Sequence, residues 1–219
     1  MAAHSDFRND SLGRLRRTLE AVYTITFSPR DEVEAMASQV RASHARVRGE
    51  SPQHYSAFSP DAQMWVVATL VQLSVEMFER FVAPLELMER EAFYRDMRIF
   101  GTYFGLPADR GPQNWKEFVE YYRGMIEGDI LGSLPVSREL AHHIAYPGKP
   151  FMLRSLWPLS GALAREYLPS PLREKLGLPV SASSRLTSAM LDAVLPGLIP
   201  WLPSSLRFAK KYRRAISCI

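Results

Sequence analysis

Cysteine is almost absent from this chain: one occurs in 219 residues, at position 218. A single cysteine excludes an intrachain disulfide and any metal site built from several thiolates. Long hydrophobic runs are also absent, because the most apolar stretch, residues 64–82, contains Gln72, Glu76, Glu79 and Arg80. A bilayer-spanning helix of about 20 residues tolerates few such groups. We therefore expect residues 64–82 to form a buried helix in a soluble, cytoplasmic protein.

The common catalytic patterns are missing as well. The chain has no HExxH or paired Glu-x-x-His metal motif, no GxSxG elbow, no phosphate loop and no dinucleotide fingerprint. Its formal net charge is only +4, and much of the excess lies in the last fifteen residues. A basic surplus confined to one end does not indicate nucleic-acid binding. Hydrolytic zinc chemistry, a catalytic triad and a nucleic-acid partner are therefore not expected.

What the chain does contain is helical periodicity with helical start and stop signals. Sustained period-two alternation, the mark of strands, is absent. The patterns predict helices over residues 11–27, 29–49, 60–82, 85–104, 114–128 and 137–146. After Arg154, prolines interrupt short helical runs as far as Pro203. The prediction is an all-α fold, one helical domain over residues 1–219 with a proline-broken C-terminal portion.

His44 is the residue with the most chemical information. Ser28 and Pro29 are suited to the start of its helix, and Gly49 to the end. The apolar stripe of that helix is predicted to comprise Val33, Met36, Ala37, Val40, His44 and Val47. A histidine on such a stripe is either a hydrogen-bonded core residue or a metal ligand. The pattern alone favours the core residue.

The first predicted helix places Arg14, Arg17 and Thr18 on one face, at steps of three and four. Its inward stripe is expected to hold the apolar residues Leu12, Leu15, Leu19, Val22 and Tyr23. Without further information, the polar trio is a solvated basic patch beside the core.

Three segments in order resemble a known family: RLRRT, then VRASHARVRG, then YSAFSPDAQMWVVATLV. The arrangement is similar to the mpaB/rubber oxygenase catalytic domain, the family of the latex-clearing proteins. The likeness is clearest from Arg14 to Leu131, and it continues in YLPSPLREKLGLP. The segments together, rather than any one of them, carry the resemblance.

The resemblance implies an all-α fold with a buried haem b pocket. The axial iron ligand of the family falls on His44. The distal arginine, lysine and threonine fall on Arg14, Arg17 and Thr18, with Arg17 in place of the lysine. Members use haem and dioxygen to cleave carbon–carbon double bonds in isoprenoid chains. The implied function is a haem-dependent oxygenase-like oxidoreductase acting on an apolar, isoprenoid or olefinic substrate.

Other expectations accompany this resemblance. Arg41 and Arg48 flank His44 and are candidates to bind the haem propionates; the alternative is a solvated helix edge. Family members usually carry additional N-terminal residues, so some of these are expected to be missing here. The alternative function is a non-catalytic haem- or lipid-binding helical protein. The segment LPGLIPWLPSSLRFAKKYRRAISCI, where apolar residues stand among cations, is a candidate for weak membrane-surface contact.

Overall fold

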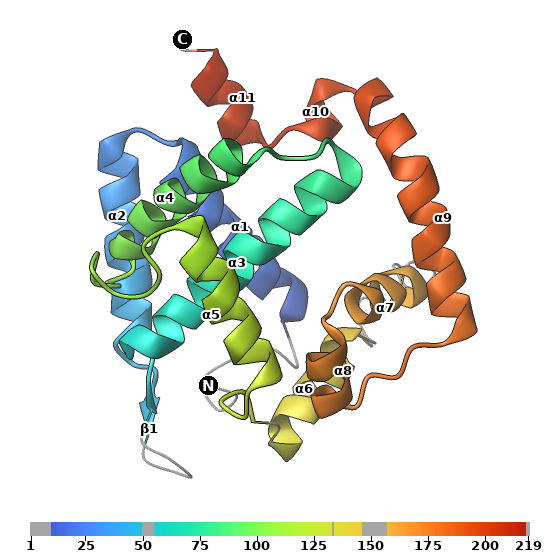
Figure 1. The fold of residues 1–219 in the computed structure, drawn as a ribbon. Helices are drawn as coiled ribbons and strands as arrows, with labels where there is room; N and C mark the ends of the chain where they lie inside the picture. The colour runs from blue at the N-terminus through green and yellow to red at the C-terminus, as the bar shows by residue number, and fades with distance from the viewer. Residues whose placement is uncertain (1–9, 50–54, 133, 146–156, 218–219) are drawn as a thin grey trace. The chain divides into compact units, whose positions relative to one another are not determined.

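The computed structural model describes residues 10–49, 55–132, 134–145 and 157–217 (Figure 1). Within these residues the contacts define two units, one of residues 12–121 with 198–217 and one of residues 10–11 with 122–197. The all-α prediction is confirmed: the one sheet in the described ranges is an antiparallel pair of two-residue strands, β1 (Arg48–Gly49) and β2 (Tyr55–Ser56). The single domain over residues 1–219 stays a prediction.

The first unit contains most of the helices that the sequence predicts. Its elements are α1 (Ser11–Phe27), α2 (Arg30–His44), α3 (Pro60–Phe81), α4 (Leu87–Tyr103), the start of α5 (Trp115–Glu127), the 3-10 turn η3 (Ile199–Trp201), α10 (Ser204–Arg207) and α11 (Lys210–Ile216). The predicted bounds of α1, α3, α4 and α5 agree with these to within two residues.

Local capping residues account for where these helices begin. Ser59 is extended, and Pro60 occupies the first helical position of α3. A capping box begins α4, in which the backbone N–H of Glu86 donates to Glu89 Oε2 at 2.8 Å. The predicted box at α5 is present in a modified form. The backbone N–H of Glu117 donates to Asn114 Oδ1 at 2.9 Å, while the Glu117 carboxylate accepts from the backbone N–H of Gln113 at 2.8 Å.

Helices α3 and α4 lie against each other as an antiparallel pair (Figure 1). Gly101 allows this close approach, because a Cβ atom there would lie 3.1 Å from Leu106 Cδ2 and 3.3 Å from Val67 Cγ2. The side chain of Gln63 on α3 donates from Nε2 to the carbonyl of Phe104 at 2.9 Å. A partly buried hydrogen bond and close backbone packing therefore hold this end of the pair together.

An aromatic cluster joins α4 to α5. The ring of Phe118 is fully buried, with its centroid 4.9 Å from that of Tyr94 and 5.0 Å from that of Trp115. The hydroxyl of Tyr94 donates to the carbonyl of Pro112 at 2.8 Å. Burial raises the pKa of Tyr94 to about 12, so the hydroxyl stays a donor. The cluster fixes the first turns of α5 beside α3 and α4.

The predicted extent of α2 is wrong at its C-terminal end. The helix stops at His44 instead of continuing to Gly49. The backbone N–H of Val47 donates to His44 O at 2.8 Å, and Val47 O accepts from the N–H of Ala57 at 2.9 Å. These bonds turn the chain into the β1–β2 pair and leave no backbone for another helical turn. His44 thus lies at a helix end, and Val47 is not part of a helical stripe.

The predicted inward stripe of α1 is also wrong in its first half. Leu12, Leu15 and Leu19 are between 39% and 53% exposed. The buried residues of α1 are Thr24 and Ile25, near its C-terminal end. Ile25 belongs to a core cluster with Val33, Ala37 and Phe100, so α1 is packed by its second half. Three leucines on its first half remain uncovered.

Helix α11 packs against the junction of α1 and α2. The ammonium group of Lys211 lies 3.2 Å from both Ser28 Oγ and Glu32 Oε2. The rings of Phe27 and Tyr212 meet edge to face at 5.3 Å between centroids. Ser28 therefore binds Lys211, whereas the sequence assigned it to the N-cap of α2, where Pro29 stands.

The second unit holds the proline-interrupted helices that the sequence predicts. They are α6 (Pro135–Ala145), α7 (Trp157–Glu166), α8 (Ser170–Leu176) and α9 (Ala182–Leu198). Hydrogen bonds connect them: Ser184 Oγ donates to Glu166 Oε1 at 3.0 Å, and the Tyr167 hydroxyl donates to Asp192 Oδ1 at 3.1 Å. Helix α8 begins directly after Pro169.

Replacing Phe118 tests the role of the aromatic cluster. Phe118→Ala removes a fully buried ring and leaves a cavity against Tyr94 and Trp115. We expect the free energy of unfolding to fall by about 3–5 kcal/mol in denaturant titrations. Leu186→Ala, at a position 72% exposed, is the control and should change it by less than about 0.5 kcal/mol. Equal effects of the two substitutions would contradict this packing.

Candidate functional site around His44

His44 lies at the last residue of α2 with its side chain half-buried. Its ring meets that of Phe58 edge to face, with centroids 6.5 Å apart and planes at 73°. The Nδ1 atom is buried and has no hydrogen-bond partner among the described residues. A buried polar atom without a partner is costly and is uncommon in native structures. Within the described residues, this nitrogen of His44 thus lacks the hydrogen bond that a core histidine would make.

The surroundings of His44 favour its neutral form. Burial lowers the pKa of the imidazole, and the nearby positive charge of Arg14 lowers it further. The pKa of Arg14 is itself lowered, first by burial and then by the charge of Arg17. The site thus combines a neutral imidazole with a half-buried guanidinium group. A neutral ring nitrogen is the form of histidine that binds a metal.

Gln63 belongs to this neighbourhood, although the sequence analysis did not select it. It is 8% exposed, and its Oε1 atom is buried without a hydrogen-bond partner in the described part of the chain. A Cβ atom at Gly105 would lie 3.6 Å from Gln63 Nε2 and 3.8 Å from Phe58 Cδ1, so Phe58 neighbours both Gln63 and His44. The signal in the sequence is a polar residue on the buried face of α3, beside Met64 and Val67.

The structure brings some of the other predicted site residues toward His44. The charge of Arg14 reaches the imidazole, and that of Arg17 reaches Arg14. Arg17 and Thr18 are exposed on α1. In the described part of the chain, no hydrogen bond joins Thr18 to His44.

Arg41 and Arg48 are both exposed. Arg41 lies one turn before His44, where its Nη1 donates to the carbonyl of Tyr103 at 2.6 Å. This bond ties the end of α2 to the end of α4. Arg48 lies in β1, outside the helix in which the sequence placed it. Their assignment to haem propionates stays a prediction.

Two of the remaining four histidines lie in the part of the chain that the structure describes, and neither belongs to a candidate metal cluster there. His142 and His143 lie in α6 of the second unit, while His4 and His54 fall outside the described residues, as does Cys218. In the described ranges, no group of three or more His, Cys, Asp or Glu residues is placed to hold a metal ion. A haem iron needs only one or two protein ligands, so a single histidine is sufficient for it.

The C-terminal segment presents large apolar side chains to solvent. Trp201 is 86% exposed and Leu206 is 74% exposed. One of the basic side chains of this segment contacts α2 and the turn before it, because Lys211 binds Glu32 and Ser28. Helices long and apolar enough to cross a bilayer are not found in the described residues. Membrane-surface contact through this segment stays a prediction.

A comparison with known families decides the relationship that the motifs indicate. Residues 1–198 match the family described as "ER-bound oxygenase mpaB/B'/Rubber oxygenase, catalytic domain". The chain belongs to this oxygenase family. The resemblance stated from the RLRRT, VRASHARVRG and YSAFSPDAQMWVVATLV segments is thereby confirmed, and His44, Arg14 and Gln63 all lie within the matched region.

Two mycobacterial proteins are similar over much of the chain. One from Mycobacterium bovis and one from Mycobacterium tuberculosis, both described as uncharacterized, are each 28% identical over 162 residues. The alignment covers 70% of this chain and 63% of each relative, so the chain spans less than two thirds of their length. No solved structure matches the chain.

Titration of His44 tests the electrostatics of the site. In the ligand-free protein, its NMR titration midpoint should lie below the ordinary value of 6.5. Arg14→Gln should raise the midpoint but leave it below that value, because burial is the larger cause. Arg16→Gln, which removes an exposed positive charge from the same helix as Arg14, is the matched control and should leave the midpoint unchanged. A midpoint at or above the ordinary value in the wild type would contradict this environment.

The same shift sets the direction of a pH effect on stability. The folded state disfavours protonated His44, so the unfolded state binds more protons between the two pKa values. The contribution of His44 to the free energy of unfolding is fully present above the unfolded pKa. It is lost as the pH falls through the lowered pKa of the folded state.

Proposed function

We propose that this chain binds haem b through His44 and uses it, with dioxygen, to oxidise an apolar olefinic substrate. One observation carries the proposal. In a chain of an oxygenase family, a half-buried neutral imidazole lies at the end of α2, and its buried Nδ1 has no hydrogen-bond partner within the residues that the structure describes. Haem b would supply the one-electron and dioxygen chemistry that protein side chains lack.

The donor set around His44 fits such a cofactor. An iron-ligating histidine binds through one neutral nitrogen, while the other nitrogen donates a hydrogen bond that fixes the ring. His44 Nδ1 is a buried donor without an acceptor when Nε2 is the ligand atom. Gln63 Oε1, in the neighbourhood of Phe58, is a buried acceptor without a donor among the described residues. The two groups are complementary in type, so we assign Gln63 as the residue that would orient His44.

Arg14 has a separate role in this proposal. A partly desolvated guanidinium stabilises negative charge more strongly than one in water, and burial already lowers the pKa of Arg14. It would therefore stabilise negative charge that develops during oxygen chemistry and donate hydrogen bonds there. Thr18 lies four residues later on α1 and would orient a water or substrate molecule. Arg17 would add positive charge, while Arg41 and Arg48 would bind the propionates.

The exposed leucines of α1 support an apolar substrate. Leu12, Leu15 and Leu19 share the helix of Arg14 and face solvent in the first half of α1. An isoprenoid chain or another olefin would cover this apolar surface. The proposed reaction consumes one dioxygen per double bond. The carbon–carbon double bond breaks, each carbon takes one oxygen atom, and two carbonyl products form without an external reductant.

Haem retention tests the ligand assignment. Protein expressed with sufficient haem supply should show a Soret band that co-elutes with the chain in gel filtration. His44→Ala should lose at least about 90% of it, because the one proposed axial nitrogen is removed. His143→Ala, which alters another half-buried histidine, is the control and should retain it. Full retention of haem in His44→Ala would remove the basis of the assignment.

Turnover tests the catalytic claim separately. With an isoprenoid substrate, oxygen consumption should accompany aldehyde and ketone products. Arg14→Gln should lower the rate by about 10²-fold while haem is retained, the magnitude expected for one electrostatic donor. Arg16→Gln, on the same helix but with an exposed side chain, should leave the rate within about twofold of the wild type. A wild-type rate in Arg14→Gln would show that Arg14 has no such role.

A non-catalytic haem- or lipid-binding protein is the second candidate. The observation that favours it is Arg17, an exposed guanidinium at the position where the family pattern has a lysine. Arginine does not lose its proton under ordinary conditions and cannot replace an amine that does. Haem binding without oxygen consumption on any olefin would select this candidate.

A further inference from the structure

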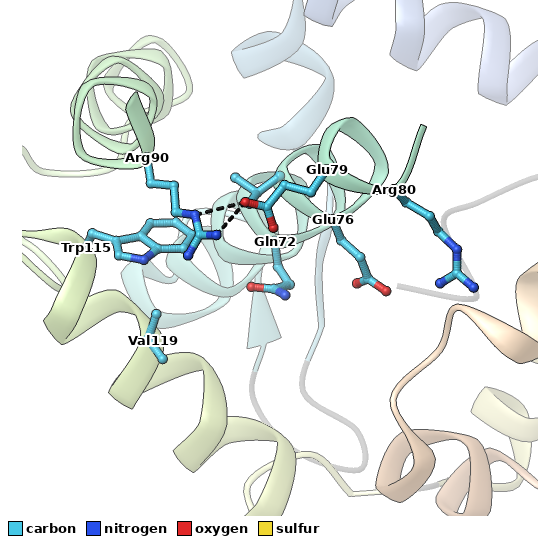
Figure 2. A pocket seen from close by; sticks show the side chains of 8 residues that line it. Gln72, Glu76, Glu79, Arg80, Arg90, Trp115 and Val119 are labelled. Atoms are coloured by element: carbon cyan, nitrogen blue, oxygen red, sulfur yellow. Dashed lines mark hydrogen bonds and ion pairs between the residues drawn. The ribbon is translucent and has the colours of Figure 1, made fainter. Parts of the chain in front are cut away.

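A second candidate site lies in the first unit, away from His44. A pocket of about 470 Å³ is formed by side chains of α3, α4 and α5 (Figure 2). The pocket residues of α3 begin at Gln72, more than two helical turns beyond Gln63, which neighbours the His44 site. The volume is within the range of small-molecule sites.

On one side of the pocket, the charges of Glu79 and Arg90 neutralise each other. Glu79 Oε1 accepts from Arg90 Nε at 2.9 Å and from Arg90 Nη2 at 2.5 Å. It also accepts from the backbone N–H of Leu85 at 3.3 Å. The guanidinium of Arg90 lies 5.9 Å from the ring centroid of Trp115. Neither charge of this ion pair is available to a ligand without breaking these contacts.

Two other polar side chains of the pocket, those of Gln72 and Glu76, do not take part in this ion pair. Gln72 and Glu76 are one turn apart on α3, and Figure 2 shows both side chains extending from the helix in the same direction. Both residues are half-buried, and neither side chain makes a hydrogen bond in the part of the chain that the structure describes. Burial raises the pKa of Glu76, and the charge of Arg80 offsets this only in part. The carboxylate is thus desolvated without a full counter-charge.

The remaining surface of the pocket is apolar. Val75 is buried, Val119 is half-buried, and the indole of Trp115 forms the α5 side. A ligand that satisfies the pocket needs hydrogen-bond donors and positive charge at one end, and a short apolar body at the other. A primary ammonium group supplies three donors and the missing charge.

We propose that this pocket binds a small organic cation, a primary amine whose ammonium group pairs with Glu76 and Gln72 and whose alkyl part contacts Val75, Val119 and Trp115. Binding of an organic anion is disfavoured, because the guanidinium of Arg90 is already paired with the carboxylate of Glu79. Arg80 extends from α3 on the far side of Glu76 from Trp115 (Figure 2). The site requires neither haem nor His44, so its failure and the failure of the proposed oxygenase function are distinguishable.

A comparison of matched small probes tests the charge preference. The full-length protein is titrated with n-butylammonium, 1-butanol and butanoate up to about 50 mM, and the indole N–H resonance of Trp115 is followed by NMR. We expect saturable binding of butylammonium with a Kd of about 1–10 mM and at least about tenfold weaker binding of butanol. Equal binding of butanol, preference for butanoate, or no saturable binding of butylammonium would each overturn the proposal.

Two test variants and one control identify the charge responsible for amine binding. Glu76→Gln keeps the side-chain shape and should weaken butylammonium binding by at least about tenfold. Glu120→Gln, an exposed site on α5, is the control and should have no effect. Arg80→Gln removes the cation that partly offsets Glu76 and should strengthen binding by about two- to fivefold. Unchanged binding in Glu76→Gln, or weaker binding in a folded Arg80→Gln, would contradict the assignment.

Discussion

The antiparallel contact between α3 and α4 is the constraint on which both candidate sites depend. Gly101 lets the two helices approach where a Cβ atom would press on Val67 and Leu106. The bond from Gln63 to Phe104 ties the pair at one end, and the ion pair of Glu79 with Arg90 ties it at the other. The His44 neighbourhood lies at the first end and the amine pocket at the second. A change in the register of this pair would alter both sites together.

Burial of a titratable side chain determines the chemistry of both sites, but it suits one to a metal and the other to an organic cation. Burial disfavours the charged form of any titratable group. At His44 this keeps the imidazole neutral, the form suited to a metal ligand, and Arg14 acts in the same direction. At Glu76 it leaves a carboxylate poorly compensated, the form suited to a cationic partner. In the described ranges, neither His44 Nδ1 nor the Glu76 carboxylate has a hydrogen-bond partner. This distinguishes them from the Glu79–Arg90 pair and from Tyr94, whose hydroxyl donates to the carbonyl of Pro112.

The sequence was sufficient where local signals determine the structure. Ser59-Pro60 and Asn114 with Glu117 predicted the starts of α3 and α5, and the ordered motifs identified the family. It failed where the structure depends on contacts that a helical pattern does not record. The end of α2 depends on the pairing of β1 with β2, which residue periodicity does not encode. The exposure of Leu12 and Leu15 depends on which half of α1 the core covers.

The residues of the two candidate sites could likewise be predicted from the sequence only in part. His44 and Arg14 could be selected from the sequence because each stands in a motif. Gln63 could not, because its importance arises from a buried oxygen without a partner beside Phe58. The amine pocket was equally inaccessible, since it needs side chains from α3, α4 and α5 in one place.

Chemical rescue of a His44→Gly variant tests the central claim most directly. The variant is mixed with haem b in the absence and presence of millimolar imidazole, and the haem that co-elutes with the protein is measured by its absorption spectrum. We expect little bound haem without imidazole, and recovery of a histidine-ligated spectrum when imidazole occupies the vacated position. A variant that binds haem with the wild-type spectrum in the absence of imidazole would contradict it.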